Sequence, residues 1–205
     1  MKKILIASDI HGSAYYCREL FKRIEEECPD RIVLLGDFLY HGPRNDLPAE
    51  YDPKQVITML NSRRDEYICV RGNCDTEVDQ MVLDFPILAE YGMLLLGDET
   101  VFMTHGHHHG EKNPPPMKSG DILLCGHTHV PACTAHEGFL YMNPGSVAIP
   151  KQGSRHSYMT WENGEFYWKD VTDGEIWHCR QDGEIKLGML QREGRRGQKG
   201  FIGNV

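Results

Sequence analysis

The stretch KILIASDIHG, residues 3–12, decides how the rest of the chain is interpreted. Its first part, Lys3 to Ala7, is an apolar run that predicts a short buried strand, and the run ends in a polar loop that carries Asp9 and His11. Ser13 follows, and it can cap a helix because apolar side chains recur every three to four residues after it. A strand, a polar loop and a capped helix together predict the opening of an α/β unit.

The first half of the chain continues this alternation. Arg31 to Leu35 and Tyr67 to Val70 are apolar runs that predict two more strands. Between them, Asp52 and Pro53 provide a cap and a first-turn proline for a second amphipathic helix. Strands that alternate with helices predict right-handed crossovers and a parallel sheet, whose functional loops lie at the carboxyl ends of the strands.

The second half has a different pattern, with short apolar or alternating runs that are mostly separated by turns. These runs are Met93 to Leu96, Val101 to Thr104, Ile122 to Cys125, Thr134 to His136 and Phe139 to Asn143. Two further runs, Tyr158 to Trp161 and Phe166 to Asp170, flank Asn163-Gly164, which predicts a hairpin. The sheet content is therefore expected to rise toward the carboxyl end.

Composition favours a folded protein with one main domain. The chain has 205 residues, of which 40% are hydrophobic and 25% are charged. We expect a single domain over residues 1–183, followed by a tail over residues 184–205 that is rich in Gly, Arg and Lys and partly disordered. A frayed end explains the tail better than a role in nucleic-acid binding.

Charge, hydropathy and cysteine content exclude several classes of partner. A formal net charge of -8 makes nucleic acid an unlikely ligand, and a small anionic substrate would need a local cation. Neither a membrane-spanning segment nor a signal peptide is evident. The seven cysteines follow no paired spacing, which favours a reducing cytoplasm over a disulfide framework. Oligomeric state is left open, and a homo-oligomer is compatible with the sequence.

Side chains that can bind metal ions follow almost every predicted strand. Because the carboxyl ends of such strands lie along one rim, side chains from distant parts of the chain can converge there. The candidate metal ligands are Asp9, His11, Asp37, Asn73, His105, His127 and His129. Taken alone, Asp-x-His or Gly-Asp is more often a turn or a capped loop, and Gly-His alone means little. Their joint occurrence in this order is what predicts a metal centre.

The donor types narrow the choice of metal. Two carboxylates, one amide oxygen and four imidazoles suit Mn, Fe or Zn better than Ca or Mg, which prefer oxygen ligands throughout. Seven ligands are too many for one ion. If Asp37 bridges, two ions can lie about 3.5–4 Å apart, as in hydrolases that act on phosphoryl groups. We interpret the neighbouring His107, His108 and His109 as loop residues at the mouth of the cleft, because consecutive side chains point in diverging directions.

These motifs resemble those of the calcineurin-like metallophosphoesterases. The similarity rests on Asp9-Ile10-His11, Gly36-Asp37, Gly72-Asn73-Cys74-Asp75, Thr104-His105-Gly106 and Gly126-His127-Thr128-His129. Within that group, the segments at His41–Asn45, Arg71–Asp75 and Asn143–Ser146 resemble the small bacterial YfcE-like phosphodiesterases. The resemblance covers about residues 1–180 and implies a four-layer α-β-β-α sandwich of two mixed sheets flanked by helices.

The resemblance also implies a ligand assignment and a mechanism. One ion would be held by Asp9, His11 and His129, the other by Asn73, His105 and His127, with Asp37 shared by both. A hydroxide that bridges the two ions would attack phosphorus. We expect Mn as the metal, with Fe, Zn or Ni as alternatives, and a small phosphodiester or phosphomonoester as the substrate.

Four residues are candidates for direct roles in catalysis, namely Arg44, Asn73, Cys74 and Asp75. Arg44 could clamp a phosphate oxygen, although an arginine in a loop is more often solvated. The family usually has a histidine after its Gly-Asn pair, as the acid for the leaving group, and this chain has Cys74 there. The departure leaves metal binding intact but predicts poor cleavage of esters with poor leaving groups.

The sequence thus predicts a metal-dependent phosphoric ester hydrolase. The alternative is a protein-binding scaffold of the same fold, which the retromer subunit of eukaryotes exemplifies. All seven ligand types are present in this chain, which favours catalysis over the scaffold.

Overall fold

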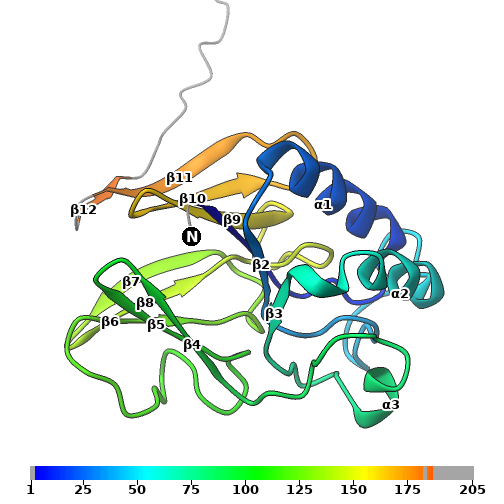
Figure 1. Cartoon of the computed structure of the whole chain (residues 1–205), viewed down its shortest axis with the longest axis horizontal. Coiled ribbons are helices and arrows are strands. Elements are labelled where there is room, and N and C mark those ends of the chain that lie inside the picture. Colours follow the sequence, from blue (N-terminus) through cyan, green and yellow to red (C-terminus); the bar gives the residue numbers. More distant parts are fainter. Residues whose placement is uncertain (1–2, 182–183, 187–205) are drawn as a thin grey trace, which may run out of the picture.

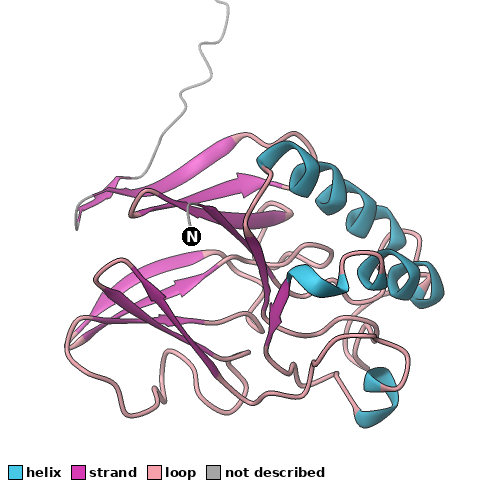
Figure 2. Ribbon diagram, viewed as in Figure 1, coloured by secondary structure: helices cyan, strands magenta, loops and turns pink. Residues whose placement is uncertain are grey.

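The fold is built on two mixed β-sheets, seen in a computed structural model that describes residues 3–181 and 184–186 (Figures 1 and 2). The seven-stranded sheet has the order β12-β11-β10-β9-β1-β2-β3 and the five-stranded sheet the order β4-β5-β6-β8-β7. The first contains β1 (Lys3–Ala7), β2 (Arg31–Leu34), β3 (Tyr67–Cys69), β9 (Ser157–Glu162), β10 (Glu165–Asp170), β11 (Ile176–Gln181) and β12 (Glu184–Lys186). The second contains β4 (Gly92–Leu96), β5 (Glu99–Met103), β6 (Asp121–Leu124), β7 (Ala132–His136) and β8 (Phe139–Asn143).

Strand β1 is central because both of its faces are apolar. Successive side chains of a strand point to opposite faces of the sheet. Ile4 and Ile6 accordingly pack in the core between the two sheets, and Leu5 and Ala7 pack in the core beneath the helices. β1 pairs in parallel with β2 and antiparallel with β9, and β2 pairs in parallel with β3.

Two helices, α1 (Ala14–Glu27) and α2 (Pro53–Asn61), cover the outer face of the seven-stranded sheet (Figure 1). The Ser13 hydroxyl caps α1 by accepting a hydrogen bond from the Tyr16 N–H at 3.2 Å, and Asp52 caps α2 in the same way. Both caps were predicted from the sequence. The 3-10 turn η1 (Arg64–Glu66) and the short helix α3 (Glu77–Gln80) were not, because neither is long enough to give a periodic pattern.

The outer face of the five-stranded sheet packs against the loop between β5 and β6. Met117 of this loop lies against a small apolar cluster of Leu123, Cys125 and Tyr141. The expected sandwich of two mixed sheets is confirmed, with α1 and α2 as a helical layer on the seven-stranded sheet. The expected fourth layer differs, because in the described residues a loop and not a helix covers the five-stranded sheet. The predicted hairpin at Asn163-Gly164 joins β9 to β10.

The expected boundary between domain and tail falls beside β12. Glu184–Lys186 pair with β11, so the seven-stranded sheet includes the first residues that we assigned to the tail after residue 183. The rest of that tail, residues 187–205, lies outside the described residues. Within the part of the chain that the structure describes, no helix has both the length and the apolar character needed to cross a bilayer.

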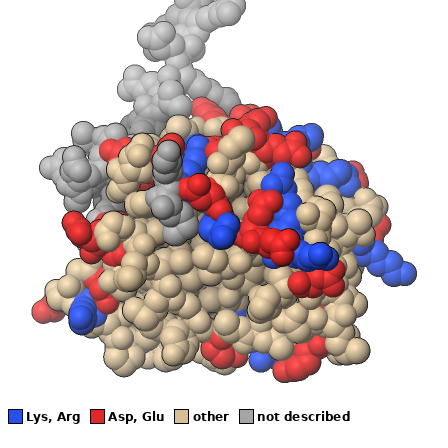
Figure 3. Space-filling view, in the orientation of Figure 1, with Lys and Arg blue, Asp and Glu red and all other residues tan. Residues whose placement is uncertain are grey.

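Acidic and basic side chains are interspersed on the face of the molecule shown in Figure 3. They gather over the helical layer, where several form ion pairs such as Arg18 with Glu50 and Arg23 with Glu26. Exposed pairs of this kind contribute little to stability, on the order of 0–1 kcal/mol each. The acidic partners therefore balance the positive charge of these arginines locally.

Candidate metal centre

The candidate ligands come from the carboxyl ends of strands in both sheets. Asp9 and His11 follow β1, and Asp37 follows β2. Asn73 follows β3, His105 follows β5, and His127 and His129 follow β6. Backbone hydrogen bonds join these loops, since the His11 N–H donates to the Asp37 carbonyl at 2.9 Å and the Gly126 N–H donates to the His105 carbonyl at 2.9 Å. Each of these bonds joins two loops of the same sheet, and the backbone N–H of His127, which donates to Asp9 Oδ2 at 3.1 Å, links the loops of the two sheets.

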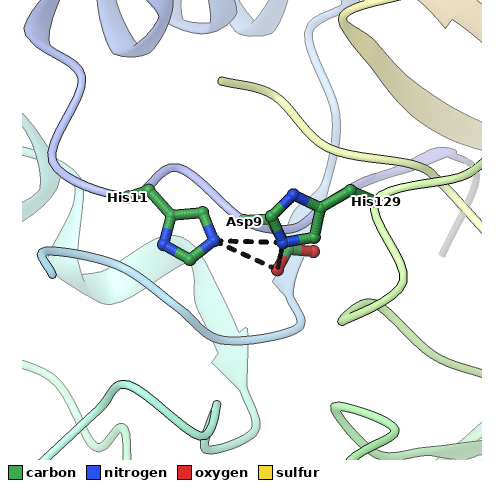
Figure 4. A group of neighbouring side chains, drawn as sticks. All are labelled: Asp9, His11 and His129. Atoms are coloured by element: carbon green, nitrogen blue, oxygen red, sulfur yellow. Dashed lines mark hydrogen bonds and ion pairs between the residues drawn. The ribbon is translucent and has the colours of Figure 1, made fainter. Parts of the chain in front are cut away.

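Two groups of ligand atoms lie at the centre of this set. Asp9, His11 and His129 place one ligand atom each within 4.8 Å of one another, and Figure 4 shows the three side chains pointing at a common space. Asp9, Asp37 and His105 form a second group by the same measure. Asp37 Oδ2 lies 3.6 Å from His11 Nε2 and 3.4 Å from His105 Nε2. The same carboxylate oxygen therefore faces both groups.

Main-chain carbonyls fix the orientation of three imidazoles. His11 Nδ1 lies 2.7 Å from the Tyr40 carbonyl, His105 Nδ1 lies 2.6 Å from the Leu35 carbonyl, and His129 Nδ1 lies 2.5 Å from the Ile149 carbonyl. A carbonyl only accepts, so each Nδ1 carries the proton, and in the neutral ring Nε2 is left with a lone pair. Metal-ligating histidines are commonly held in this way. No pattern in the sequence predicts these carbonyl partners.

The ligand atoms are arranged favourably for binding a cation and unfavourably for hydrogen bonding with one another. His11 Nε2 and His129 Nε2 are only 3.2 Å apart, and both carry lone pairs when their rings are neutral. Asp9 Oδ1 is buried and has no hydrogen-bond partner among the described residues, although His129 Nε2 lies 3.2 Å away. Buried polar atoms are normally satisfied. A divalent cation between these atoms would satisfy all three, and imidazole with carboxylate is a donor set for Mn, Fe, Ni or Zn.

Charge at the buried centre shifts the pKa values of the imidazoles. Burial alone would lower the pKa of His105, but the hydrogen bond and charge of Asp37, together with the charge of Asp9, raise it to about 9. Burial also lowers the pKa of His11, but the hydrogen bond and charge of Asp9, together with the charge of Asp37 and the contact with the Tyr40 carbonyl, raise it above its usual value. Without metal, a protonated His105 therefore offsets part of the negative charge of the two carboxylates.

Most of the ligand-bearing residues have an unusual backbone. Positive φ angles occur at Asp9 (60°), His11 (48°), Asp37 (58°), His127 (66°) and His129 (59°). The left-handed region costs a non-glycine residue on the order of 1–3 kcal/mol when the surroundings impose it. Hydrogen bonds over-determine the conformation at the first position: the Asp9 N–H donates to the Gly36 carbonyl, and the Asp9 carbonyl accepts from the Ala148 N–H and the Ser146 hydroxyl.

Two glycines allow the loops to approach the carboxylates. A Cβ added to Gly72 would lie 2.1 Å from Asp37 Oδ1, and one added to Gly126 would lie 2.9 Å from Asp9 Oδ2 and 2.0 Å from Ser8 Oγ. None of these three separations is compatible with van der Waals contact. The glycines beside the predicted ligands are therefore required by close packing.

A pocket of about 260 Å³ opens over the centre. Its lining includes the predicted ligands His11, Asp37, Asn73, His127 and His129. Arg44, the candidate clamp, lines it as well, and so does Lys151, whose Nζ donates to Asn45 Oδ1 at 2.6 Å. Sequence reasoning missed Lys151 because a single lysine in an irregular loop has no distinguishing pattern. The pocket thus combines basic side chains with the candidate metal ligands.

Asn73 and Cys74 face this pocket. Asn73 Oδ1 lies 3.1 Å from His105 Nε2, and Asn73 Nδ2 donates to Cys74 Sγ at 3.2 Å. Burial, followed by the charge of Asp37, raises the pKa of the Cys74 thiol well above its usual value. Cys74 therefore stays a neutral thiol at physiological pH, which disfavours a role as nucleophile.

Asp75 has a different environment. Its buried carboxylate accepts hydrogen bonds from the N–H groups of Asp37 (2.8 Å), Phe38 (2.9 Å) and Gly72 (2.7 Å). These contacts tie the loop after β3 to the loop after β2. In place of the catalytic role expected from the sequence, we propose that Asp75 is a positioning residue for Asp37.

Three further histidines, His107, His108 and His127, lie beside the centre. The ring centroid of His127 is 5.1 Å from that of His105. The backbone N–H of His127 donates a hydrogen bond to Asp9 Oδ2 at 3.1 Å. His107 and His108 do not diverge as we expected from their adjacency, because their ring centroids are 4.0 Å apart. The turn at Gly106, where φ is 114°, redirects the chain before them.

Comparisons with known proteins define the class. The model of the calcineurin-like phosphoesterase superfamily domain matches residues 1–164, and the chain belongs to this family. The chain is 44% identical over 163 residues to phosphodiesterase YfcE of Escherichia coli strain K12, covering 80% of this chain and 89% of that protein. It is 27% identical over 169 residues to the probable metallophosphoesterase YsnB of Bacillus subtilis, covering 78% and 85%.

Solved structures agree with this assignment. A structure of YfcE, a phosphoesterase from E. coli, matches with a TM-score of 0.84 and 41% identity over 87% of this chain and 98% of that chain. Vacuolar protein sorting 29 from Cryptosporidium parvum shares the fold, with a TM-score of 0.54 and 15% identity over 91% and 95% of the two chains. The expected family and the expected enzyme class, a hydrolase of phosphate esters, are confirmed.

The close approach of Gly72 to Asp37 leads to a first prediction. Gly72→Ala should displace the Asp37 carboxylate and weaken metal binding by more than about tenfold, because even outer-shell changes cost about 10–100-fold. Metal content after equilibrium dialysis measures this. Gly138→Ala is the control, since a Cβ there meets nothing within 4 Å and the strain at its φ of 91° falls in the turn between β7 and β8, outside the loops that carry the ligands. Equal metal binding by the two variants would contradict the packing argument.

The raised pKa of His105 leads to a second prediction. A metal requires the neutral imidazole, so binding must displace a proton at any pH below about 9. Metal affinity should therefore rise over the whole pH interval below about 9 and level off near that value. Calorimetric titrations in buffers of different ionisation enthalpy would measure the protons released. An affinity that stays constant over this interval would contradict the assignment of His105 as a ligand.

Proposed function

We propose that the chain is a phosphodiesterase that works with two divalent metal ions. Asp9, His11 and His129 would hold one ion and Asn73, His105 and His127 the other, with Asp37 shared. The observation that carries the proposal is the position of Asp37 Oδ2, which faces His11 Nε2 and His105 Nε2 at similar distances. The bound ions would lower the pKa of a coordinated water for attack on phosphorus and neutralise the phosphoryl oxygens.

The protein's own side chains bind and orient the substrate in this proposal. Arg44 and Lys151 line the pocket and bring positive charge to a molecule whose net charge is -8. Arg44 can donate two parallel hydrogen bonds to a phosphate group. Lys151 is positioned by its hydrogen bond to Asn45, which leaves its other ammonium protons for a phosphate oxygen.

The size of the pocket bears on the substrate. A volume of about 260 Å³ lies below the range of about 300–1,000 Å³ common for sites that take drug-sized ligands. A small phosphodiester or phosphomonoester therefore suits it better than a nucleic acid. Manganese is the proposed metal, with Fe, Zn or Ni as alternatives of similar ligand preference. The seven cysteines follow no paired spacing, which is compatible with a cytoplasmic location.

A binding scaffold of the same fold is the second candidate, because vacuolar protein sorting 29 shares the architecture. Fold alone does not fix function. In this chain, Asp9, His11, Asp37, His105 and His129 place their ligand atoms in two adjacent groups. A pocket with two basic side chains opens over them. These features favour hydrolysis over scaffolding.

The shared carboxylate gives a third prediction. Asp37→Asn should lose more metal and more activity than His129→Ala, because the substitution removes the anion common to both ions. We expect the rate of phosphodiester hydrolysis to decrease by at least about 10²–10³-fold in Asp37→Asn. Metal content and rate would be measured together on both variants. Unchanged metal content in Asp37→Asn, with a rate equal to that of His129→Ala, would contradict the shared position.

Cys74 gives a fourth prediction, on leaving groups. A neutral thiol of raised pKa is a weak general acid, and general-acid catalysis contributes about 10²–10⁴-fold. Aryl diesters, whose phenolate leaves without a proton, should be cleaved readily and simple alkyl diesters slowly. Cys74→His should gain selectively on the alkyl ester, and Cys74→Ser should keep most aryl-ester activity.

Exposed Cys28 supplies the control for these substitutions, because Cys28→Ser changes a thiol outside the pocket. Rates on matched aryl and alkyl diesters would be compared across the variants. If Cys74→Ser loses all activity while its metals stay bound, the thiol is essential and this account of Cys74 is wrong.

A further inference from the structure

A second group of potential ligands lies beside the metal centre and shares no residue with it. Glu90, His107 and His108, here called the rim cluster, place one ligand atom each within 4.8 Å of one another. His108 Nδ1 lies 3.2 Å from Glu90 Oε2, and the rings of His107 and His108 are 4.0 Å apart between centroids. The group lines a pocket of about 230 Å³.

The pairing of β4 with β5 brings these residues together. Gly92 lies opposite Met103 in this antiparallel pair, so the segment before β4 and the segment after β5 leave the sheet at the same end. Glu90 is in the first segment, and His107 and His108 are in the second. The proximity is therefore a consequence of strand register.

Hydrogen bonds hold the histidine loop in place. Thr104 Oγ1 donates to the His109 carbonyl at 2.8 Å and accepts from the Gly106 N–H at 2.9 Å. Asn113 Nδ2 donates to the His108 carbonyl at 3.1 Å. On the other segment, Arg71 Nη1 lies 3.5 Å from Glu90 Oε1, which leaves Oε2 directed at His108. The ligand positions are thus fixed by contacts outside the rim cluster.

His107 provides an independent observation. Its Nδ1 is buried and has no hydrogen-bond partner among the residues that the structure describes. The His107 ring also lies 5.5 Å from the ring of His105, measured between centroids, in an edge-to-face arrangement. A buried nitrogen without a partner is unusual. A metal ion is one partner that the adjacent imidazole and carboxylate would share with it.

We propose that the rim cluster is a third metal site, which binds Zn²⁺ through Glu90, His107 and His108. Two imidazoles and one carboxylate form a ligand set that Zn²⁺ uses in proteins when water completes the coordination. Hard cations such as Mg²⁺ prefer oxygen ligands throughout and are disfavoured here. The bound ion ties the segment before β4 to the loop after β5, at the border of the main centre.

The test is the zinc stoichiometry of the full-length protein, measured by equilibrium dialysis against rising free Zn²⁺. The wild type should bind three ions and Glu90→Ala and His108→Ala should bind two, with the affinity of the third ion reduced at least about tenfold. His136→Ala is the matched control, because His136 and Glu111 form a similar exposed pair at 3.0 Å outside the rim cluster. This variant should keep all three ions.

Two results would overturn the proposal. One is a wild type that binds only two ions at every concentration at which it stays in solution. The other is a third ion whose affinity is the same in Glu90→Ala, His108→Ala and the wild type. The Asp37→Asn variant separates this site from the main centre, since it should retain rim zinc even where main-centre metal is lost. Loss of main-centre metal alone would count against the proposed function and leave the rim site standing.

Discussion

The architecture of the site is governed by the close packing of carboxylate oxygens and imidazole nitrogens around Asp37. One oxygen of this carboxylate faces His11 Nε2 and His105 Nε2, and a second carboxylate, Asp9, is fully buried beside it. Carboxylates buried close together repel each other and lose their hydration. Bound protons or bound metal ions must offset this negative charge. The raised pKa of His105 corresponds to compensation by a bound proton. In the proposed catalysis, bound metal ions offset the negative charge instead.

The fold keeps these atoms together against their repulsion. Apolar strands from both sheets end at the site, and the loops that follow them are held in left-handed backbone conformations. Main-chain carbonyls orient the imidazoles, and the Asp75 carboxylate ties the loops after β2 and β3 together through three N–H groups. The geometry of the centre is therefore set by the backbone, and Gly72 and Gly126 belong to it because a Cβ at either position would collide with neighbouring side chains.

The sequence could predict the parts of the site that follow from strand order. An apolar run followed by Asp9 and His11, or by Asp37, marks a strand end, and parallel strands bring such ends together. It could not predict Lys151, the carbonyl partners of the histidines or the proximity of Glu90 to His108, because these depend on loop conformations and on the register of β4 with β5. The contacts of Asp75 could not be predicted either. Its motif resembles a catalytic segment, but its carboxylate accepts hydrogen bonds from backbone N–H groups.

The central claim is that Asp37 is shared by two metal ions. Anomalous diffraction from crystals of the Mn-loaded protein, recorded on both sides of the manganese absorption edge, tests it most directly. The account predicts two peaks that flank the Asp37 carboxylate, one toward His11 and His129 and one toward His105. A single peak, or two peaks of which only one contacts Asp37, would contradict it.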